Sequence, residues 1–310
     1  MAAGFVTGQG VNLRGGPGGP VIGGVSQGQA LETLETSGAW THVEFTRDGH
    51  IVTGWVSSQF LSAAQPVAGV ADHGLTTPDA FFHSLQTVGP VGAALSAAQR
   101  AGCEAIVTAC EGLPLSWAAY VLATACLETD RSFAIDKHEN LNYLAEALEA
   151  KYAPGRISVA NCRAVGRTAA HAADQRAIAN FIYGGDWGRI NLGNLQPDDG
   201  WTFRGRGWVQ MTGRRNYSRA DNALSLGGAL IADPDLLGRR IDACAGSVVD
   251  GMTQGWFTTR KFANYLPDHG PATVAQYTQA RRIINGQDRA ADIAQFALQF
   301  QSALMAGGWR

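Results

Sequence analysis

Hydrophobic and polar positions divide the chain into two parts with different periods. Over residues 3–62 apolar and polar residues alternate in short runs such as AWTHVEF and HIVTGWVSSQFL, and this alternation predicts half-buried β-strands. Turns rich in glycine or small polar residues separate the runs at 15–19, 37–38 and 48–49. About five short strands in such a small segment predict a closed all-β barrel over residues 1–62.

From Pro78 onward the period becomes helical. Apolar residues recur three and four positions apart in segments such as PDAFFHSL, SWAAYVLATACLETD and ADIAQFALQFQSALM, which predicts amphipathic or buried helices. The intervening residues 63–77, AAQPVAGVADHGLTT, are small and polar and predict a linker. We therefore expect a multidomain protein, with a small all-β barrel at 1–62, the linker at 63–77 and a mostly α-helical domain at 78–310.

One stretch of the helical part has a different composition. Residues 198–217, DDGWTFRGRGWVQMTGRRNY, combine glycines with arginine, glutamine, threonine and aromatic side chains. Glycines allow close backbone approach, and the polar and aromatic groups suit the wall of a cleft for a polar, ring-shaped ligand such as a sugar. An arginine-rich surface loop is an equally good interpretation of composition alone.

Charge and composition exclude several functions. The formal net charge of −2 gives no reason to expect binding to nucleic acid or to an anionic membrane, and Asp198, Asp199 and Asp221 bracket the arginines of 204–219. No apolar run is long enough to cross a membrane. The N-terminal MAAGFVTGQGVNLRGG lacks the pattern of a secretory signal, so we expect a cytoplasmic protein unless another agent releases it.

Cysteine and histidine spacing gives no sign of a metal or a cofactor. The five cysteines have no C-x-x-C spacing and lie mostly in apolar helical segments, which predicts buried free thiols. The histidines show neither H-x-x-x-H nor H-E-x-x-H spacing, so we expect no metal site and no cofactor.

Glu128 is the first candidate for acid–base chemistry. It ends the nearly uncharged segment SWAAYVLATACLETD, and Ala125, Thr124 and Val121 lie three, four and seven positions before it. The helical period therefore places Glu128 on an apolar face, partly buried. Burial raises the pKa of a carboxyl group, as a general acid that protonates a glycosidic oxygen requires. A glutamate paired with a nearby arginine at the helix end is the alternative.

Glu139 is the candidate for the second carboxylate, since it lies eleven positions after Glu128 and a loop of this size can carry it across a cleft from Glu128. Inverting glycosidases hold their two carboxyl groups about 6.5–9.5 Å apart and retaining ones about 5 Å apart, a separation that the sequence does not give. Asp136 and Asp130 are rivals for this role. Glu139 could instead begin the next helix, where acidic residues are favoured.

Four segments in order resemble the family 19 glycoside hydrolases: AAYVLATACLETDRSF, ENLNYLAEAL, IANFIYGGDWGRINLGNLQPDDGWTFRGRGWVQMTGRRNY and ARRIINGQ. The resemblance covers about Pro78 to Trp309 and is strongest to the phage and bacterial endolysins that cut peptidoglycan, with plant-type chitinases more distant. It implies a lysozyme-like helical domain and hydrolysis with inversion. Leu127 stands where the family has a histidine before the acidic residue.

The resemblance also implies a role for individual residues. Glu128 matches the general acid and Glu139 the candidate general base, while Thr212 matches a hydroxyl that holds the attacking water. Gln210, Asn216, Tyr217 and Asn285 match family residues near the sugar or the catalytic water. From their chemistry, Trp208 could offer a stacking face for a sugar ring, with core packing as the commoner alternative, and Arg206 could orient side groups, with a structural role or pairing with an acid as the alternative. The candidates for substrate binding are Gln210, Asn216, Tyr217, Asn285, Trp208 and Arg206.

The N-terminal part resembles a bacterial SH3-like domain through VNLRGGPG, WTHVEF and TGWVSSQFL. Such domains commonly bind cell-wall peptides, so the resemblance implies a wall peptide as partner. Trp40 and Trp55 are interpreted as barrel core rather than as a ligand platform, and no binding residue is assigned in this part.

Together these features predict a phage-type endolysin that hydrolyses β-1,4 bonds in peptidoglycan glycan strands. We expect a monomer that is made in the host cytoplasm and acts on the cell wall, with no nucleic acid or membrane partner. A chitinase is the first alternative. The second is an inactive glycan-binding protein, for which Leu127 is the only support.

Overall fold

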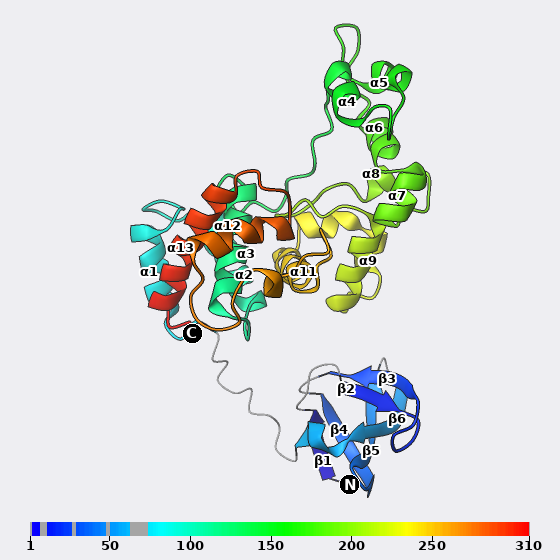
Figure 1. Cartoon of the computed structure of the whole chain (residues 1–310), viewed down its shortest axis with the longest axis vertical. Helices are drawn as coiled ribbons and strands as arrows, with labels where there is room; N and C mark the ends of the chain where they lie inside the picture. The colour runs from blue at the N-terminus through cyan, green and yellow to red at the C-terminus, as the bar shows by residue number, and fades with distance from the viewer. Residues whose placement is uncertain (1, 7–10, 27–28, 48–49, 63–73, 310) are drawn as a thin grey trace. The chain divides into compact units, whose positions relative to one another are not determined.

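The computed structural model describes residues 2–6, 11–26, 29–47, 50–62 and 74–309 (Figure 1). The contacts within the chain divide it into two compact units, residues 1–72 and 73–310, and each is described by itself. Most of the predicted linker, residues 63–73, lies outside the described residues, as does the predicted turn at 48–49.

The first unit is an antiparallel β-sheet. Its described strands follow the order β3-β2-β6-β5-β4-β1-β7, and a short 3₁₀ segment, η1 (Ser58–Phe60), precedes the last one. The strands are β1 (Ala2–Val6), β2 (Val11–Arg14), β3 (Val21–Val25), β4 (Ala30–Ser37), β5 (Trp40–Arg47), β6 (His50–Ser57) and β7 (Leu61–Ser62).

The register of the sheet separates a buried face from an outward face. Val43 lies opposite Gly54 and Thr41 opposite Val56 on the buried face. A Cβ at Gly54 would lie 2.7 Å from the Leu13 side chain, so only glycine leaves room for that core residue. The buried core of the unit consists of Val6, Val11, Leu13, Val25, Leu31, Val43, Phe45 and Val56.

Trp40 and Trp55 do not belong to this core, contrary to the sequence interpretation. Both are only partly buried, because they occupy the alternate positions of β5 and β6 that point away from Val43 and Val56. The period-two pattern was sufficient to find the strands, but the bulk of an indole ring wrongly suggested the inner face.

The second unit is mostly helical, which confirms the predicted fold class. Its helices are α1 (Pro78–Val88), α2 (Ala97–Ala109), α3 (Leu115–Glu128), α4 (Ala145–Tyr152), α5 (Val159–Val165), α6 (Gln175–Ile182), α7 (Gly185–Leu192), α8 (Asp199–Thr202), α9 (Arg214–Ala223), α10 (Ala229–Ala232), α11 (Ile241–Gln254), α12 (Val274–Ala280) and α13 (Ala290–Ala306). Short 3₁₀ segments are η2 (Pro234–Gly238), η3 (Phe262–Asn264) and η4 (Arg281–Ile283).

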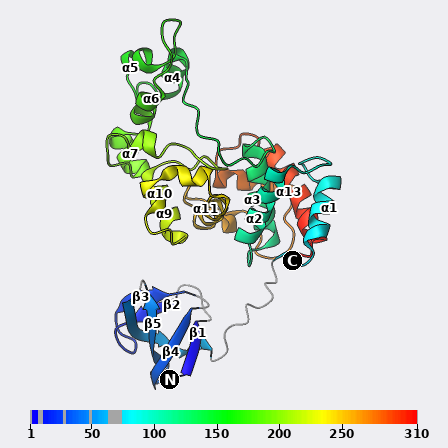
Figure 2. The ribbon, with the colours of Figure 1, turned by 180° about the vertical axis from the view of Figure 1, so that it is seen from behind.

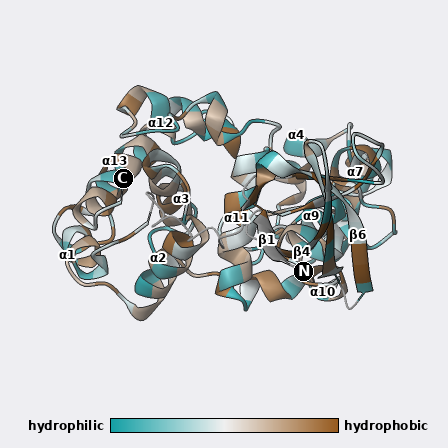
Figure 3. Cartoon of the chain, turned by 90° about the horizontal axis from the view of Figure 1, so that it is seen from below, coloured by the Kyte–Doolittle hydropathy of each residue, from teal (hydrophilic) through white to brown (hydrophobic). Residues whose placement is uncertain are grey.

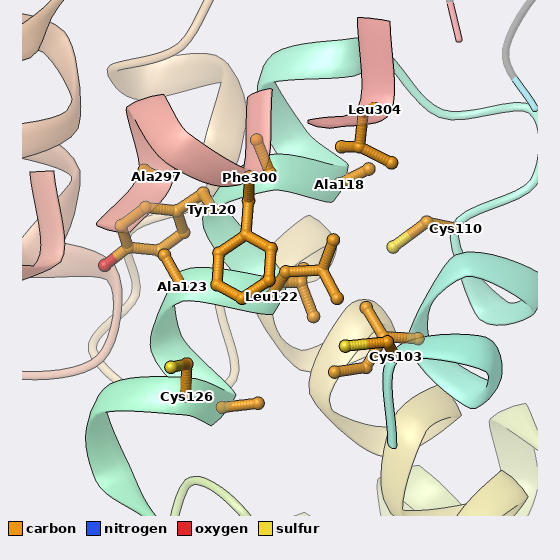
Figure 4. Packing of buried hydrophobic residues seen from close by; sticks show 14 of the residues in the cluster. Cys103, Cys110, Ala118, Tyr120, Leu122, Ala123, Cys126, Ala297, Phe300 and Leu304 are labelled. Carbon is orange, nitrogen blue, oxygen red and sulfur yellow. The ribbon is translucent and has the colours of Figure 1, made fainter. Parts of the chain in front are cut away.

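Helix α3 lies at the centre of the largest hydrophobic core. All its residues from Leu115 to Leu127 are buried except Trp117, and α13 packs along it, with Phe300 and Leu304 beside Ala118, Leu122 and neighbouring residues (Figure 4). Its many alanines carry little side-chain volume, so neighbouring helices can approach closely. The C-terminal end of α3 is therefore held in a fixed position by the core.

Two smaller cores support the rest of the unit. One lies among α4, α5 and α6 and includes Leu141, Leu148 and Ile178, and the other lies beneath α9 and α10 and includes Phe203 and Tyr217. The views from the front and from behind both show α4, α5 and α6 apart from α1, α3 and α13 (Figures 1 and 2). The unit thus has separate packed regions that the long loops connect.

All five cysteines are free and buried, as predicted, and burial raises the pKa of the Cys126 thiol to about 12.

Hydrophilic residues recur along the helices of the second unit (Figure 3). No helix within the described ranges is both long and apolar enough to cross a membrane.

Candidate functional site

Glu128 is the last residue of α3, so the buried helix fixes where its side chain begins. The side chain is 28% exposed and the residue as a whole is exposed, so the partial burial expected from the helical period is seen only for the side chain. The carboxyl group lies at the edge of the main core, where solvent and a ligand have access to it.

A buried arginine holds one oxygen of this carboxyl group. Arg281 donates from Nη1 to Glu128 Oε1 at 2.6 Å and from Nε to the carbonyl of Asp288 at 3.0 Å. It is only 2% exposed, so its charge depends on Glu128 for compensation. No described residue donates a hydrogen bond to the other oxygen, Glu128 Oε2, which is left available to a ligand.

The packing of α3 also determines the position of Arg281. The hydroxyl of Tyr120, in the middle of α3, donates to the carbonyl of Ala280 at 2.9 Å, and Ala280 immediately precedes Arg281. The two members of the ion pair are therefore fixed to the same buried helix, one directly and one through this hydrogen bond.

The loop of residues 129–138 lies along the glycine-rich stretch. The indole Nε1 of Trp208 donates to the carbonyl of Phe133 at 3.0 Å, and Gln210 Nε2 donates to the carbonyl of Lys137 at 3.3 Å. Two segments far apart in sequence thus lie side by side. The two candidate carboxylates flank this loop.

Two donors hold Glu139. The hydroxyl of Tyr183 donates to Oε1 at 2.6 Å, and the backbone N–H of Gly205 donates to Oε2 at 3.1 Å. Burial, followed by the negative charge of Glu139, raises the pKa of Tyr183 above its ordinary value, so the phenol keeps its proton and remains a donor. The carboxylate therefore has a fixed orientation.

Gly205 permits this arrangement because it has no side chain. A Cβ at this position would lie 2.8 Å from Gln210 Oε1 and 3.2 Å from Glu139 Cβ. The backbone of Glu139 also donates to the Gly205 carbonyl at 3.0 Å. The glycine-rich stretch can therefore approach the second carboxylate closely, as its composition suggested.

The rivals of Glu139 have no comparable support. Asp130 and Asp136 are exposed, and no described residue donates a hydrogen bond to either side chain. Helix α4 begins at Ala145, so Glu139 does not start a helix. Of the three carboxylates, Glu139 is the one that the fold orients.

Arg206 is buried beneath the glycine-rich stretch, which disagrees with its prediction as a substrate-binding residue and agrees with the alternative of a structural residue paired with an acid. Its Nε donates to Asp235 Oδ1 at 2.6 Å, and its Nη1 donates to the carbonyls of Thr202 and Arg204 and to the Tyr217 hydroxyl, at 2.8, 3.0 and 3.1 Å. The guanidinium group is used within the protein and has little surface to offer a ligand.

His138 and Asp235 extend this network. Burial opposes the charge of Asp235, but the hydrogen bond and the charge of Arg206 outweigh it and hold the pKa of Asp235 below its ordinary value. Burial, helped by the charges of Arg206 and Arg204 and opposed by that of Asp235, lowers the pKa of His138. The imidazole next to Glu139 is therefore neutral at pH 7.

The side chains of Trp208 and Tyr217 are also buried, with exposures of 1% and 0%. Trp208 packs edge-on against Phe133, and Tyr217 belongs to the core beneath α9. Their predicted contacts with sugar do not agree with this placement. Both rings fill the hydrophobic cores beneath the glycine-rich stretch.

Gln210, Thr212 and Asn216 remain accessible. Each uses its donor within the protein: Gln210 Nε2 bonds to the Gly207 carbonyl at 3.1 Å, Thr212 Oγ1 to the Gln210 carbonyl at 2.9 Å and Asn216 Nδ2 to the Thr212 carbonyl at 3.1 Å. Their side-chain oxygens accept no hydrogen bond from the described residues. These oxygens are available to water or to sugar hydroxyls.

Asn285 lies on the side of the site that carries Glu128. It is exposed, its backbone N–H donates to the Arg281 carbonyl at 3.0 Å, and its Oδ1 accepts from the N–H of Gly286 at 2.8 Å. Its side-chain NH₂ has no acceptor among the described residues. The predicted roles of Asn285 and of the three accessible residues of the glycine-rich stretch stay predictions.

Two surface pockets of the second unit lie away from these residues. One of about 660 Å³ lies between α2 and α11, and one of about 540 Å³ lies at the C-terminal ends of α9 and α11. The candidate site is therefore singled out by its hydrogen bonding and not by cavity size. Among the described residues no group of three or more metal-ligating side chains is placed to hold a metal ion.

The first unit has an outward face that carries charge and aromatic rings. In register across β2, β6, β5 and β4 lie Arg14, Trp55, His42 and Glu35. The rings of His42 and Trp55 stack at 4.9 Å, His42 Nδ1 lies 3.5 Å from Glu35 Oε1, and Arg14 lies over the ring of Trp40. We call these five residues the aromatic face.

Residues 9–62 match the bacterial SH3 domain family. The match covers most of the unit that carries the aromatic face, which we call the SH3 unit. Bacterial SH3 domains are common in proteins that bind or hydrolyse cell walls. No curated protein matches the chain.

Sequence reasoning did not single out Arg281 and Tyr183. Both lie in segments that carry the family resemblance, ARRIINGQ and IANFIYGG. Each matters because it reaches a carboxylate more than forty residues away in sequence, and no local pattern reports such a contact.

Proposed function

We propose that the helical unit hydrolyses β-1,4 glycosidic bonds in the glycan strands of bacterial peptidoglycan, with Glu128 as general acid and Glu139 as general base. The observation that supports this most is the pair of carboxylates flanking one loop in different surroundings. Glu128 keeps one oxygen free beside a buried arginine, whereas Glu139 is oriented by Tyr183 and Gly205.

In the proposed reaction the protonated form of Glu128, which its pairing with Arg281 disfavours, donates its proton to the glycosidic oxygen as the bond from that oxygen to the anomeric carbon breaks. Glu139 takes a proton from a water molecule whose oxygen forms the new bond to that carbon. The Arg281 guanidinium then faces the carboxylate that Glu128 has become. A proton from solvent restores Glu128, and release of the proton from Glu139 completes the cycle.

Thr212 would direct the attacking water. Because its hydroxyl hydrogen is used toward the Gln210 carbonyl, its oxygen can accept a hydrogen bond from that water. Attack from the face opposite the leaving group inverts the anomeric carbon, as the family resemblance implies. Proton NMR of the first products distinguishes α from β reducing ends and tests this point.

The SH3 unit is proposed to bind the cell wall and to raise the local concentration of substrate for the helical unit. The family match supports this role. A phage-type endolysin, made in the host cell and acting on its wall, fits the combination of the two units.

The direct test measures turbidity loss of outer-membrane-stripped cells with the full chain, Glu128→Gln, Glu139→Gln and the control Glu111→Gln, which changes an exposed glutamate after α2. General acid–base catalysis accounts for about 10²–10⁴-fold in rate. We expect losses of that size for the first two variants and none for the control. Full activity of Glu128→Gln would refute the assignment of Glu128 as the acid. Cleavage of colloidal chitin without any cleavage of peptidoglycan would refute peptidoglycan as the substrate.

A further inference from the structure

The pocket at the C-terminal ends of α9 and α11 lies outside the proposed catalytic machinery. It has a volume of about 540 Å³, within the range of about 300–1,000 Å³ that is usual for ligand sites. Both views show α9 and α11 beside one another (Figures 1 and 2). We call it the α9–α11 pocket, and it is lined by Arg219, Asn222, Ala223, Gln254, Gly255 and Trp256.

Most polar groups of its side chains have no partner within the described part of the protein. Arg219 and Asn222 are exposed, and neither side chain has a hydrogen-bond or ion-pair partner among the described residues. The indole Nε1 of Trp256 donates to Gln254 Oε1 at 3.3 Å, which leaves the Gln254 NH₂ group without an acceptor in the described part of the chain. The pocket thus presents several free donors and an amide oxygen.

The remaining wall is a tryptophan ring that is partly buried against the core beneath α9. A flat apolar surface flanked by amide groups suits an amino sugar, because its hydroxyl and acetamido groups need donors and acceptors while its C–H face needs an apolar surface. A ligand with a purely apolar body would leave the polar side chains unpaired.

Helix α9 connects this pocket to the candidate active site. Asn216 lies in its first turn, and Arg219 and Asn222 follow at steps of three residues. Successive members of this series are neighbours on the helix surface, so the series winds gradually around α9, with Asn216 and Asn222 about 120° apart. At about 1.5 Å per residue, Asn222 lies roughly 9 Å farther along the helix than Asn216. A short oligosaccharide can span this distance.

We propose that the α9–α11 pocket is a distant subsite that binds an N-acetylhexosamine residue of the glycan strand while another part of the strand occupies the site at Glu128. This inference rests on the proposed function, since the strand must run along α9. The subsite would strengthen the binding of long strands and would contribute nothing to substrates too short to reach it.

The test uses the full chain and glycan strands freed of their stem peptides, so that a wall peptide cannot bind the SH3 unit. The variants are Arg219→Ala with Asn222→Ala, Trp256→Ala and the more conservative Trp256→Phe. The control is Arg163→Ala, which removes an arginine that is 73% exposed on α5. Hydrolysis is measured against strand length, and binding is measured by calorimetry in the Glu128→Gln background.

We expect the double variant to raise KM for long strands about tenfold, since two lost hydrogen bonds of about 0.7 kcal/mol each give that factor. Its kcat, and its activity on the shortest cleavable oligosaccharide, should equal those of the unmodified chain. Trp256→Phe should bind better than Trp256→Ala, and Arg163→Ala should change nothing.

An unchanged KM and an unchanged affinity for long strands in the double variant would overturn the subsite while leaving the proposed hydrolysis intact. Strand binding that depends on Arg219 and Asn222 in a chain that cleaves no glycan would uphold the pocket and overturn the proposed function. An equal loss of activity on short and long substrates would also overturn the subsite, because it would place these residues in the catalytic site.

Discussion

Replacing Glu128 by glutamine, Arg281 by methionine and both together measures how strongly the two side chains depend on each other. In Glu128→Gln the amide can still accept one hydrogen bond, but the buried guanidinium loses its counter-charge. In Arg281→Met the carboxylate loses its only ion-pair partner among the described residues. In the double variant neither an isolated charge nor an ion pair is left.

The magnitude follows from the burial of the two partners. Breaking a buried ion pair by removing one member costs about 3–5 kcal/mol. Because Glu128 is 28% exposed and keeps contact with water, we expect a smaller loss of about 2–3 kcal/mol for each single variant, below this range. For a domain of this size that lowers Tm by roughly 5–10 °C.

The assay is calorimetric unfolding of the full chain, with the transition of the helical unit as readout. We add the losses in free energy of unfolding of the two single variants and compare the sum with the loss in the double variant. We expect the loss in the double variant to be smaller than this sum by about 1–3 kcal/mol. The matched control is Arg163→Met with Glu149→Gln, an exposed pair whose charged atoms lie 3.9 Å apart, for which about 0.5 kcal/mol or less is expected. Additive effects at Glu128 and Arg281 would refute the coupling.

Three further changes test other parts of the account. Gly205→Ala should lower activity at least about tenfold with a small effect on stability, since its Cβ would lie 3.2 Å from Glu139 Cβ and displace that carboxylate; unchanged kcat would contradict this. Thr212→Ala should lower kcat about 10–100-fold while Thr212→Ser retains most of it, and equal rates for the two variants would remove the hydroxyl from the mechanism. Burial opposes the charge of Asp199, but hydrogen bonds from Arg214 outweigh it and hold the pKa of Asp199 below its ordinary value. The ionised Asp199 therefore stabilises the fold above about pH 4, and this stabilisation is lost as the pH falls through the lower pKa of the folded state. Asp199→Asn should lower the free energy of unfolding by about 3 kcal/mol at pH 7 and by much less near pH 2. Urea unfolding at the two pH values measures the difference.

The fold class followed from the sequence because each part has a clear period. Period two in residues 3–62 and helical spacing after Pro78 correspond to the observed β-sheet and helices. The inner and outer faces of the sheet were harder to separate, since Trp40 and Trp55 are apolar enough for the core but point outward.

The candidate site was only partly predictable. The helical spacing placed Glu128 at the end of a buried helix, but the residue is exposed, and the alternative of an arginine partner is what the structure shows, because Arg281 pairs with it. Which arginine, and which donors orient Glu139, depends on contacts across the fold. Composition also could not reveal that Arg206, Trp208 and Tyr217 face inward, since aromatic and cationic side chains suit both a cleft and the scaffold beneath it.

The most direct test of the central claim is mass spectrometry of borohydride-reduced products after digestion of purified peptidoglycan by the full chain and by Glu128→Gln. Hydrolysis of glycan strands predicts new reducing-end sugars with the unmodified chain and about a hundredfold fewer or none with the variant. A reducing-end MurNAc identifies a muramidase, and a reducing-end GlcNAc a glucosaminidase. Release of stem peptides without new reducing ends, or equal product from the variant, would contradict the proposed function.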